Sequence, residues 1–321
     1  MRVSGVNSRV RPVCGLLVVV WAVLAGLTVG LAQPASIDGA QLMRDLQTLS
    51  ADAMEGRLAG TPGGARARDY IVQRFKQAGI TPVGKSYEHP FTFRGRGESA
   101  DRGGVNVVGV IEGRRDPSRY IVMTAHYDHL GVRNGQIYNG ADDNASGVAA
   151  LLAVASRLSA ERPEHSVLLA AVDAEELGLH GARALLRSPP VPREAMVLNV
   201  NLDMVARDAK NVLFASGTSH YPFLKEYLAS VARSPVVLRF GHDTPGSKED
   251  DWTRDSDHFP FHEAGIPFVY FGVEDEAHHH KPTDDPETVT REFFVGAANT
   301  ILAAVRAFDA NLEAIGKAAK R

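Results

Sequence analysis

Short apolar runs alternate with amphipathic stretches along most of this chain. The apolar runs have the length of buried strands and predict six of them, at Val105–Ile111, Tyr120–Ala125, Ser166–Val172, Val197–Leu202, Val212–Ala215 and Pro267–Phe271. Apolar residues at helical spacing predict helices over Ser146–Leu158, Gly181–Leu186, Pro222–Val231 and Glu287–Leu312. Strands that alternate with helices favour a parallel sheet that is covered on both faces. The sequence therefore predicts an α/β fold, a three-layer sandwich with a mostly parallel central sheet and helices on both faces.

The first 32 residues have the pattern of a secretory signal peptide. An uncharged and strongly apolar stretch, residues 13–32, follows three arginines, Arg2, Arg9 and Arg11. Gly30 and Ala32 are small residues just before a cleavage site at Gln33. The prediction is an exported protein, periplasmic or secreted, with a single domain over residues 33–321. An uncleaved membrane anchor is the alternative, because about 20 uncharged residues can also span a bilayer.

Charge and cysteine content exclude two classes of protein. The chain has 35 Lys and Arg residues against 38 Asp and Glu residues, a formal net charge of −3. A dedicated nucleic-acid-binding protein carries a strongly basic face, so no nucleic-acid partner is expected. The only cysteine, Cys14, lies in the N-terminal apolar stretch. A cysteine nucleophile in residues 33–321 is therefore excluded.

Polar side chains gather where the predicted strands end. His126 and Asp128 follow one strand, and the pair Glu175-Glu176 and the single Asp203 follow two others. Sites of open α/β sheets form beyond the carboxyl ends of the strands, so these side chains are expected to meet. Histidine together with carboxylates suits zinc, which binds them at about 2.0–2.2 Å. The pattern therefore predicts a metal centre.

Two further segments complete the set of candidate ligands. Asp142 and Asp143 lie in a loop that enters a helix, and three consecutive histidines, residues 278–280, come after the last strand with Asp284. Neighbouring side chains of an extended segment point in opposite directions, so at most one or two of these histidines can reach the same ion. A shared carboxylate can hold two metal ions about 3.5–4 Å apart. The candidate ligands can therefore supply a site for two zinc ions, and the resemblance described next implies two zinc ions as the cofactors.

Taken in this order, the motifs resemble those of the co-catalytic zinc exopeptidases. This is the family of bacterial leucyl aminopeptidases, which includes glutamate carboxypeptidase II and, more distantly, glutaminyl cyclase. The similarity begins at Asp45-Leu-Gln-Thr-Leu-Ser and Glu55-Gly-Arg-Leu-Ala-Gly and extends to the final helix. The resemblance implies the zinc exopeptidase fold and peptide substrates with a free N-terminus. It also implies hydrolysis by a water molecule held between two zinc ions.

The resemblance further implies a role for each candidate residue. The ligands it implies are His126 and Asp203 for one zinc ion, Glu176 and His280 for the other, and Asp143 as the carboxylate that bridges both. Glu175 matches the general base. Asp128 and Asp284 match the residues that orient His126 and His280. The peptide bond between Asp143 and Asn144 is expected to be cis.

Some positions keep an alternative. Many relatives have tyrosine just before the last histidine, where it polarises the oxyanion, and this chain has His279 there. Either His279 takes that role or another donor does. Asp142 is an alternative to Asp143 as the bridging ligand. Ser256-Asp257-His258 is similar to part of a serine triad, but adjacent residues seldom meet as a triad, and a helix N-cap is favoured there.

The predicted function is that of an exported zinc-dependent aminopeptidase. The segment 239–258 has six acidic residues against three basic ones. If this segment faces the zinc ions, its field favours a protonated amino terminus over a terminal carboxylate. The alternatives are a glutaminyl cyclase-like or carboxypeptidase-like enzyme of the same fold, and a non-catalytic binding module. A membrane is a partner only if the N-terminal segment is uncleaved.

Overall fold

The computed structural model describes residues 36–94, 100–229, 231, 236–247, 250–275 and 277–320, together with residues 1, 2, 4 and 5. Residues 36–321 form one compact unit, which does not include residues 1–35. Apart from those four residues, the predicted signal peptide over residues 1–32 lies outside the described part of the chain.

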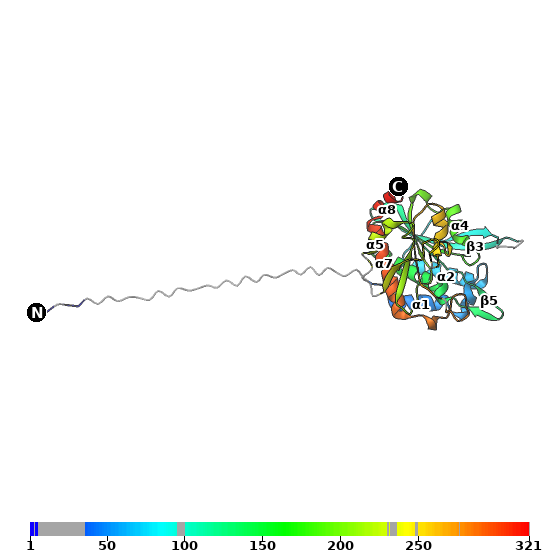
Figure 1. The fold of residues 1–321 in the computed structure, drawn as a ribbon, viewed down its shortest axis with the longest axis horizontal. Coiled ribbons are helices and arrows are strands. Elements are labelled where there is room, and N and C mark those ends of the chain that lie inside the picture. Colours follow the sequence, from blue (N-terminus) through cyan, green and yellow to red (C-terminus); the bar gives the residue numbers. More distant parts are fainter. Residues whose placement is uncertain are drawn as a thin grey trace. The chain divides into compact units, whose positions relative to one another are not determined.

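A nine-stranded mixed sheet forms the middle of the unit (Figure 1). Its strands are β1 (Thr81–Pro82), β2 (Glu88–Phe93), β3 (Arg102–Ile111), β4 (Asp116–His126), β7 (His165–Val172), β8 (Met196–Leu202), β9 (Val212–Ser216), β10 (Val237–Phe240) and β11 (Phe268–Gly272). Their order across the sheet is β1-β3-β7-β4-β8-β11-β9-β10, and β2 pairs with β3. The central strands β7, β4, β8 and β11 run parallel, and antiparallel pairs flank them. A separate hairpin joins β5 (Gly131–Arg133) to β6 (Gln136–Tyr138).

Helices cover both faces of this sheet, which confirms the predicted three-layer α/β fold. The helices are α1 (Gly39–Leu49), α2 (Pro62–Gln77), α3 (Gly147–Glu161), α4 (His180–Arg187), α5 (Lys225–Ala229), α6 (His258–Glu263), α7 (Arg291–Ala310) and α8 (Leu312–Ala318). The helices α1, α3 and α7 pack together over the larger apolar core, whereas α4 and α6 cover the smaller one. The C-terminal pattern predicted as one helix is broken at Asn311 into α7 and α8.

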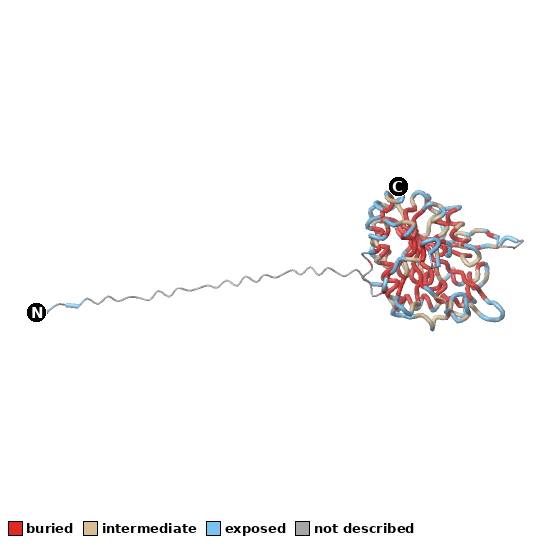
Figure 2. The backbone as a smooth tube through the Cα atoms, in the orientation of Figure 1, coloured by how far each residue is buried: buried red, intermediate tan, exposed pale blue. Residues whose placement is uncertain are grey.

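The apolar runs of the central strands contribute side chains to both apolar cores. Ile121 and Met123 of β4 belong to the larger core, and Val122 between them belongs to the smaller core. Successive side chains of a strand point to opposite faces, so a strand covered on both sides is apolar at every position. This is why buried residues fill the middle of the unit (Figure 2). The edge strand β2 instead alternates between exposed and half-buried positions over most of its length, so its sequence has no apolar run.

The longest helix is apolar as well as long. Over the described residues, α7 is the one helix that by length and composition alone could cross a membrane, and 67% of the tested window is buried inside the domain. Phe293, Ile301 and Phe308 are among its residues in the larger core. Packing within the domain therefore accounts for its apolar character.

Candidate metal centre

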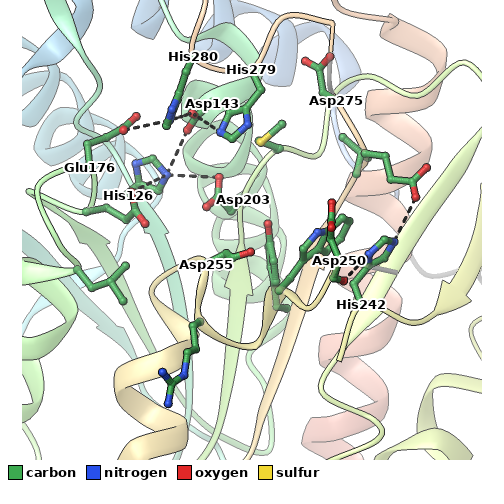
Figure 3. A pocket seen from close by; sticks show the side chains of 18 of the residues that line it. His126, Asp143, Glu176, Asp203, His242, Asp250, Asp255, Asp275, His279 and His280 are labelled. Carbon is green, nitrogen blue, oxygen red and sulfur yellow. Dashed lines mark hydrogen bonds and ion pairs between the residues drawn. The ribbon is translucent and has the colours of Figure 1, made fainter. Parts of the chain in front are cut away.

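The predicted ligands lie together at the carboxyl end of the parallel strands. His126 ends β4, Asp203 directly follows β8, and Glu176 lies in the turn after β7. Asp143 lies in the turn before α3, and His280 lies in the loop after β11. All five line one cavity of about 780 Å³. Figure 3 shows them at one end of that cavity, with His242 and Asp250 apart from them.

His126 is buried and faces two carboxylates. Its Nε2 atom lies 3.4 Å from Oδ1 of Asp143 and 3.3 Å from Oδ1 of Asp203. The other ring nitrogen, Nδ1, lies 3.2 Å from the main-chain oxygen of Asp128, closer than the 3.8 Å to its carboxylate. A hydrogen bond from Nδ1 to that oxygen leaves Nε2 free to bind a metal ion.

His280 approaches the cluster from the opposite side. Its Nε2 atom lies 3.2 Å from Oδ2 of Asp143 and 3.1 Å from Oε2 of Glu176. The two oxygens of Asp143 therefore face two different histidines, His126 and His280, which is the arrangement of a carboxylate shared by two metal ions. The peptide bond between Asp143 and Asn144 is cis, as expected.

The neighbouring Asp142 points away from the cluster. Its Oδ1 atom accepts a hydrogen bond of 2.8 Å from the amide of Ala206, and its Oδ2 atom lies 3.6 Å from Arg207. Asp284 was expected to orient His280, but its carboxylate instead accepts hydrogen bonds from the amides of Asp142 and Asp143 and from Arg207. The physical reason is that the tight turn leaves these amides without main-chain partners, and a buried amide needs an acceptor. Asp284 thus positions the turn that carries Asp143.

The adjacent carboxyl groups of Glu175 and Glu176 have opposite pKa shifts. Burial raises the pKa of Glu175 well above its ordinary value. The charge of His126 opposes this shift, whereas Asp257, Asp203 and Glu176 add to it. Burial also raises the pKa of Glu176, but hydrogen bonds from His129 and His280 outweigh this and lower it to about 2. Two neighbouring carboxyl groups whose pKa values are shifted in opposite directions suit different roles, Glu175 as a proton carrier and Glu176 as a metal ligand.

The donor set fits zinc. Three groups of three side chains each offer ligand atoms within 4.8 Å of one another, and the first and the last share Asp143: Asp143, His279 and His280; His126, Glu175 and Asp203; and His129, Asp143 and Glu176. The Oδ1 atom of Asp203 is buried and has no hydrogen-bond partner among the residues that the structure describes. A buried carboxylate oxygen needs a compensating partner, and a cation beside His126 would supply one.

Comparison with known proteins agrees with this geometry. The sequence profile described as peptidase family M28 matches residues 106–305. This chain belongs to peptidase family M28. The family is described as one of peptidases, and a relative that matches this chain is described as a probable zinc metalloprotease. The predicted family resemblance is thereby confirmed.

Curated relatives match between about half and two thirds of this chain. The chain is 30% identical over 218 residues to a "Probable zinc metalloprotease" of Leptosphaeria maculans, covering 56% of this chain and 48% of that protein. It is 29% identical over 215 residues to aminopeptidase YwaD of Bacillus subtilis, covering 62% and 44% of the two chains. The chain thus spans about half the length of these relatives or less.

Solved structures share the fold of this M28 peptidase. The zinc aminopeptidase BSAP of Bacillus subtilis superposes with a TM-score of 0.67 at 17% identity, covering 85% of this chain and 95% of that one. A glutaminyl cyclase of Porphyromonas gingivalis superposes with a TM-score of 0.68 at 16% identity, covering 84% and 98%. The fold is therefore shared by peptidases and cyclases.

A buried chain of hydrogen bonds holds Asp203 in this M28 peptidase. Ser256 donates to Oδ2 of Asp203 at 2.6 Å, and Asn201 donates to Ser256 at 2.8 Å. Thr124 then donates to Asn201, and Asn199 donates to Thr124. Sequence analysis missed this role. The available signal was that Asn199, Asn201 and Asp203 recur at every second position of an otherwise apolar strand, and so share one face.

The segment Ser256-Asp257-His258 is not a serine triad. Ser256 is bound to Asp203, and Nε2 of His258 lies 2.9 Å from the main-chain oxygen of Trp252. Asp257 is the residue before α6, and its side chain makes no capping hydrogen bond. Its two carboxylate oxygens are buried without a hydrogen-bond partner among the described residues.

His129 is a second residue that sequence analysis missed. It is fully buried, and its Nδ1 atom lies 2.6 Å from Oε1 of Glu176 and 3.7 Å from Oδ2 of Asp143. Its ring packs over Gly140, where a Cβ atom would lie 2.5 Å from the ring. His129 thus fixes the carboxylate of Glu176. Only its position three residues after His126 could have signalled this.

A fully buried arginine lies beneath the cluster. Arg57, from the Glu55-Gly-Arg motif, donates to four main-chain oxygens, those of Leu49, Tyr127, Asn139 and Gly140. Burial lowers its pKa to about 10, while the carboxylates of the centre, Asp143, Asp284, Asp128 and Glu176, act in the opposite direction. Arg57 therefore ties together the loops around the centre and adds positive charge beside its carboxylates.

Proposed function

We propose that this M28 peptidase is a two-zinc aminopeptidase. The observation that carries the proposal is that Asp143 turns one oxygen to His126 and the other to His280, with Asp203 and Glu176 beside them. This supports one ion held by His126 and Asp203 and a second held by Glu176 and His280. Asp143 would be common to both.

Glu175 would carry the proton during hydrolysis. When bound, zinc supplies the Lewis acid that polarises the scissile carbonyl and lowers the pKa of the attacking water. Glu175 accepts one proton from this water as the water oxygen bonds to the carbonyl carbon. When the C–N bond then breaks, Glu175 returns the proton to the leaving amine. Its Oε2 atom lies 3.9 Å from Nε2 of His126, so it borders the site of attack.

The wall of the cavity supports recognition of a free amino terminus. Beyond the ligands and Glu175, four further carboxylates line it, those of Asp250, Asp255, Glu274 and Asp275. Of the acidic segment 239–258, Asp250 and Asp255 thus reach the cavity, whereas Asp243 accepts hydrogen bonds from Gly217 and Ser219. A negative field attracts a protonated amine and repels a carboxylate. A carboxypeptidase would instead need an arginine fork for the terminal carboxylate. Arg254 is the one arginine among the described residues that line this cavity, and carboxylates outnumber it there.

A substrate panel tests this function. We expect hydrolysis of free aminoacyl p-nitroanilides and loss of most activity when the same substrates are N-acetylated. Efficient release of carboxyl-terminal residues from N-blocked peptides would contradict the aminopeptidase assignment. Cyclisation of glutaminyl peptides with release of ammonia, in place of hydrolysis, would favour the cyclase alternative.

A substitution of Glu175 tests the mechanism. Glu175→Gln keeps the shape of the side chain and removes the proton acceptor, so turnover should fall by about 10²–10⁴-fold. Zinc content, measured by mass spectrometry, should stay at the wild-type level. Glu263→Gln is the matched control, because Glu263 forms an exposed ion pair with Arg183. Loss of zinc from the Glu175 variant would instead identify Glu175 as a ligand.

Export is part of the proposal and rests on the N-terminal sequence alone. The apolar residues 13–32 and the small residues Gly30 and Ala32 support cleavage before Gln33. N-terminal sequencing of protein recovered from the periplasm or medium should begin at Gln33. A full-length chain in the membrane fraction would instead support the uncleaved anchor.

A further inference from the structure

Hydrolysis of a peptide bond needs a hydrogen-bond donor for the negative charge that develops on the carbonyl oxygen. The sequence offered His279 for this role. The structure places its ring 47% exposed, with Nε2 at 3.6 Å from Oδ2 of Asp143. His279 therefore borders the shared carboxylate and lacks a rigid, dry setting. The cavity contains a second candidate, the phenol of Tyr270.

Tyr270 is held by the sheet on both sides. It lies in β11, where it pairs with Asn201 of β8 and with Ser216 of β9. It is 6% exposed, and the part of it that is accessible lines the cavity together with the metal ligands. A residue paired in the middle of a sheet keeps its position while substrate binds, as an oxyanion donor must.

The ring and the hydroxyl of Tyr270 are also fixed. The ring stacks on His258 at 4.7 Å between centroids and packs against Trp252 at 5.7 Å. A Cβ atom at Gly272 would lie 2.9 Å from both Cζ and the hydroxyl oxygen of Tyr270. Only glycine at position 272 therefore leaves room for the tip of this phenol.

The hydroxyl of Tyr270 has no hydrogen-bond partner among the described residues. Buried tyrosine hydroxyls usually have one, so this hydroxyl is available to a ligand in the cavity. Burial raises its pKa well above the ordinary value, and the charges of Asp203, Asp143, Asp255 and Glu175 raise it further. A phenol with the ordinary pKa of about 10 is already protonated at neutral pH, as a donor requires.

We propose that Tyr270 is the oxyanion donor of this peptidase, in a different part of the chain from the tyrosine that many relatives have before the last histidine. As the water oxygen bonds to the carbonyl carbon, the carbonyl π electrons move to the oxygen, which accepts a hydrogen bond from Tyr270. Glu175 takes the proton of the water. When the C–N bond breaks, the carbonyl re-forms and Glu175 protonates the amine, while Tyr270 keeps its own proton throughout. This inference rests on the proposed function.

The test is Tyr270→Phe, which removes the hydroxyl and leaves the ring on His258. We expect kcat on an aminoacyl p-nitroanilide to fall by about 10²–10³-fold, with KM within about threefold of wild type. Zinc content should not change. Binding of an aminoacyl phosphonate, a stable mimic of the tetrahedral species, should weaken by a factor similar to the loss in kcat. Binding of the free amino acid product should not change.

Two further variants complete this test. Tyr221→Phe is the matched control, because its hydroxyl bonds to Nδ1 of His262 away from the cavity, and it should keep the wild-type kcat. Gly272→Ala leaves Tyr270 in place but displaces its hydroxyl, and it should reproduce the loss in kcat. Because the added Cβ would also lie 3.0 Å from the main-chain oxygen of Asp203, this variant must keep the wild-type zinc content for its loss in kcat to support the assignment. This second route keeps the test decisive even if Tyr270→Phe is unstable.

The possible results distinguish a failure of the Tyr270 assignment from a failure of the proposed function. An active wild type with an unchanged kcat in Tyr270→Phe overturns the Tyr270 assignment alone, as does loss of zinc from that variant. A fall of about 10²-fold in His279→Gln, with none in Tyr270→Phe, makes His279 the donor. A wild type that hydrolyses no aminoacyl substrate overturns both the proposed function and this inference.

Discussion

The two halves of the proposed metal centre are held by different kinds of structure. The strand half, His126 and Asp203, lies at the ends of β4 and β8 in the middle of the sheet. The loop half, Glu176 and His280, lies in segments after β7 and β11. The side chain of His126 is 1% exposed, whereas that of His280 is 49% exposed. Asp143 is common to both halves.

Their supports differ in the same way. Asp203 is anchored by the buried chain Ser256, Asn201 and Thr124, which runs between two paired strands. Glu176 depends on a single buried partner, His129. His280 has a φ of 57°, a left-handed conformation that is unfavourable for a residue other than glycine. The comparison indicates a rigid half that positions one ion and a second half in which His280 is open to solvent while Glu176 stays buried.

The largest effect is expected where the two halves meet. Asp143→Asn weakens a ligand of both ions, so zinc content should fall in both halves. Turnover should fall by about 10³-fold or more, because metal catalysis contributes several kcal/mol. Mass spectrometry of the dialysed protein, alongside turnover, measures this.

Asp142→Asn is the control for that change. Its side-chain oxygen can still accept the hydrogen bond from Ala206, so zinc should be retained. If Asp142→Asn loses zinc and Asp143→Asn does not, the shared carboxylate has been assigned to the wrong residue.

A smaller effect should separate the halves. Graded chelation should release zinc in two steps, with the loop-half ion leaving first because His280 is half exposed. Ser256→Ala should lower the affinity for the strand-half ion, which leaves second, by about 10–100-fold. His129→Gln should lower the affinity for the loop-half ion, which leaves first, by a similar factor. Release of both ions in one step from the wild type would remove the distinction between the halves.

The last effect concerns the packing beside the strand half. Burial lowers the pKa of His258 to about 3. Between pH 6.5 and 3 the unfolded chain takes up a proton on this residue that the folded protein excludes. This residue should therefore lower the free energy of unfolding by about 1.4 kcal/mol per pH unit as the pH falls below 6.5.

Denaturant titrations of wild type and His258→Phe at several pH values measure this contribution. Their difference isolates His258, because burial raises the pKa of Asp257 to about 7 in the opposite direction and both proteins contain that residue. A difference that does not change between pH 7.5 and 5 would show that His258 takes up its proton normally in the folded protein.

Much of this fold could be predicted because its signals are local. The apolar runs that predicted strands become β3, β4, β7, β8, β9 and β11, since a strand buried on both faces must be apolar throughout. Thr61 caps α2 by accepting a hydrogen bond from the amide of Gly64, as residues of its type do. The edge strands β1, β2 and β10 have no such signal, because they are short or partly exposed.

The sequence by itself determined which side chains end the parallel strands, and with them the zinc-binding chemistry of the family. Only the tertiary structure decided which oxygen faces which histidine and what holds each ligand. Ser256 lies 53 residues from Asp203, His129 lies 47 residues from Glu176, and Asp284 lies more than 140 residues from the turn it holds. Hydrogen bonds between such distant segments depend on how strands and loops pack. No local pattern of residues encodes that packing.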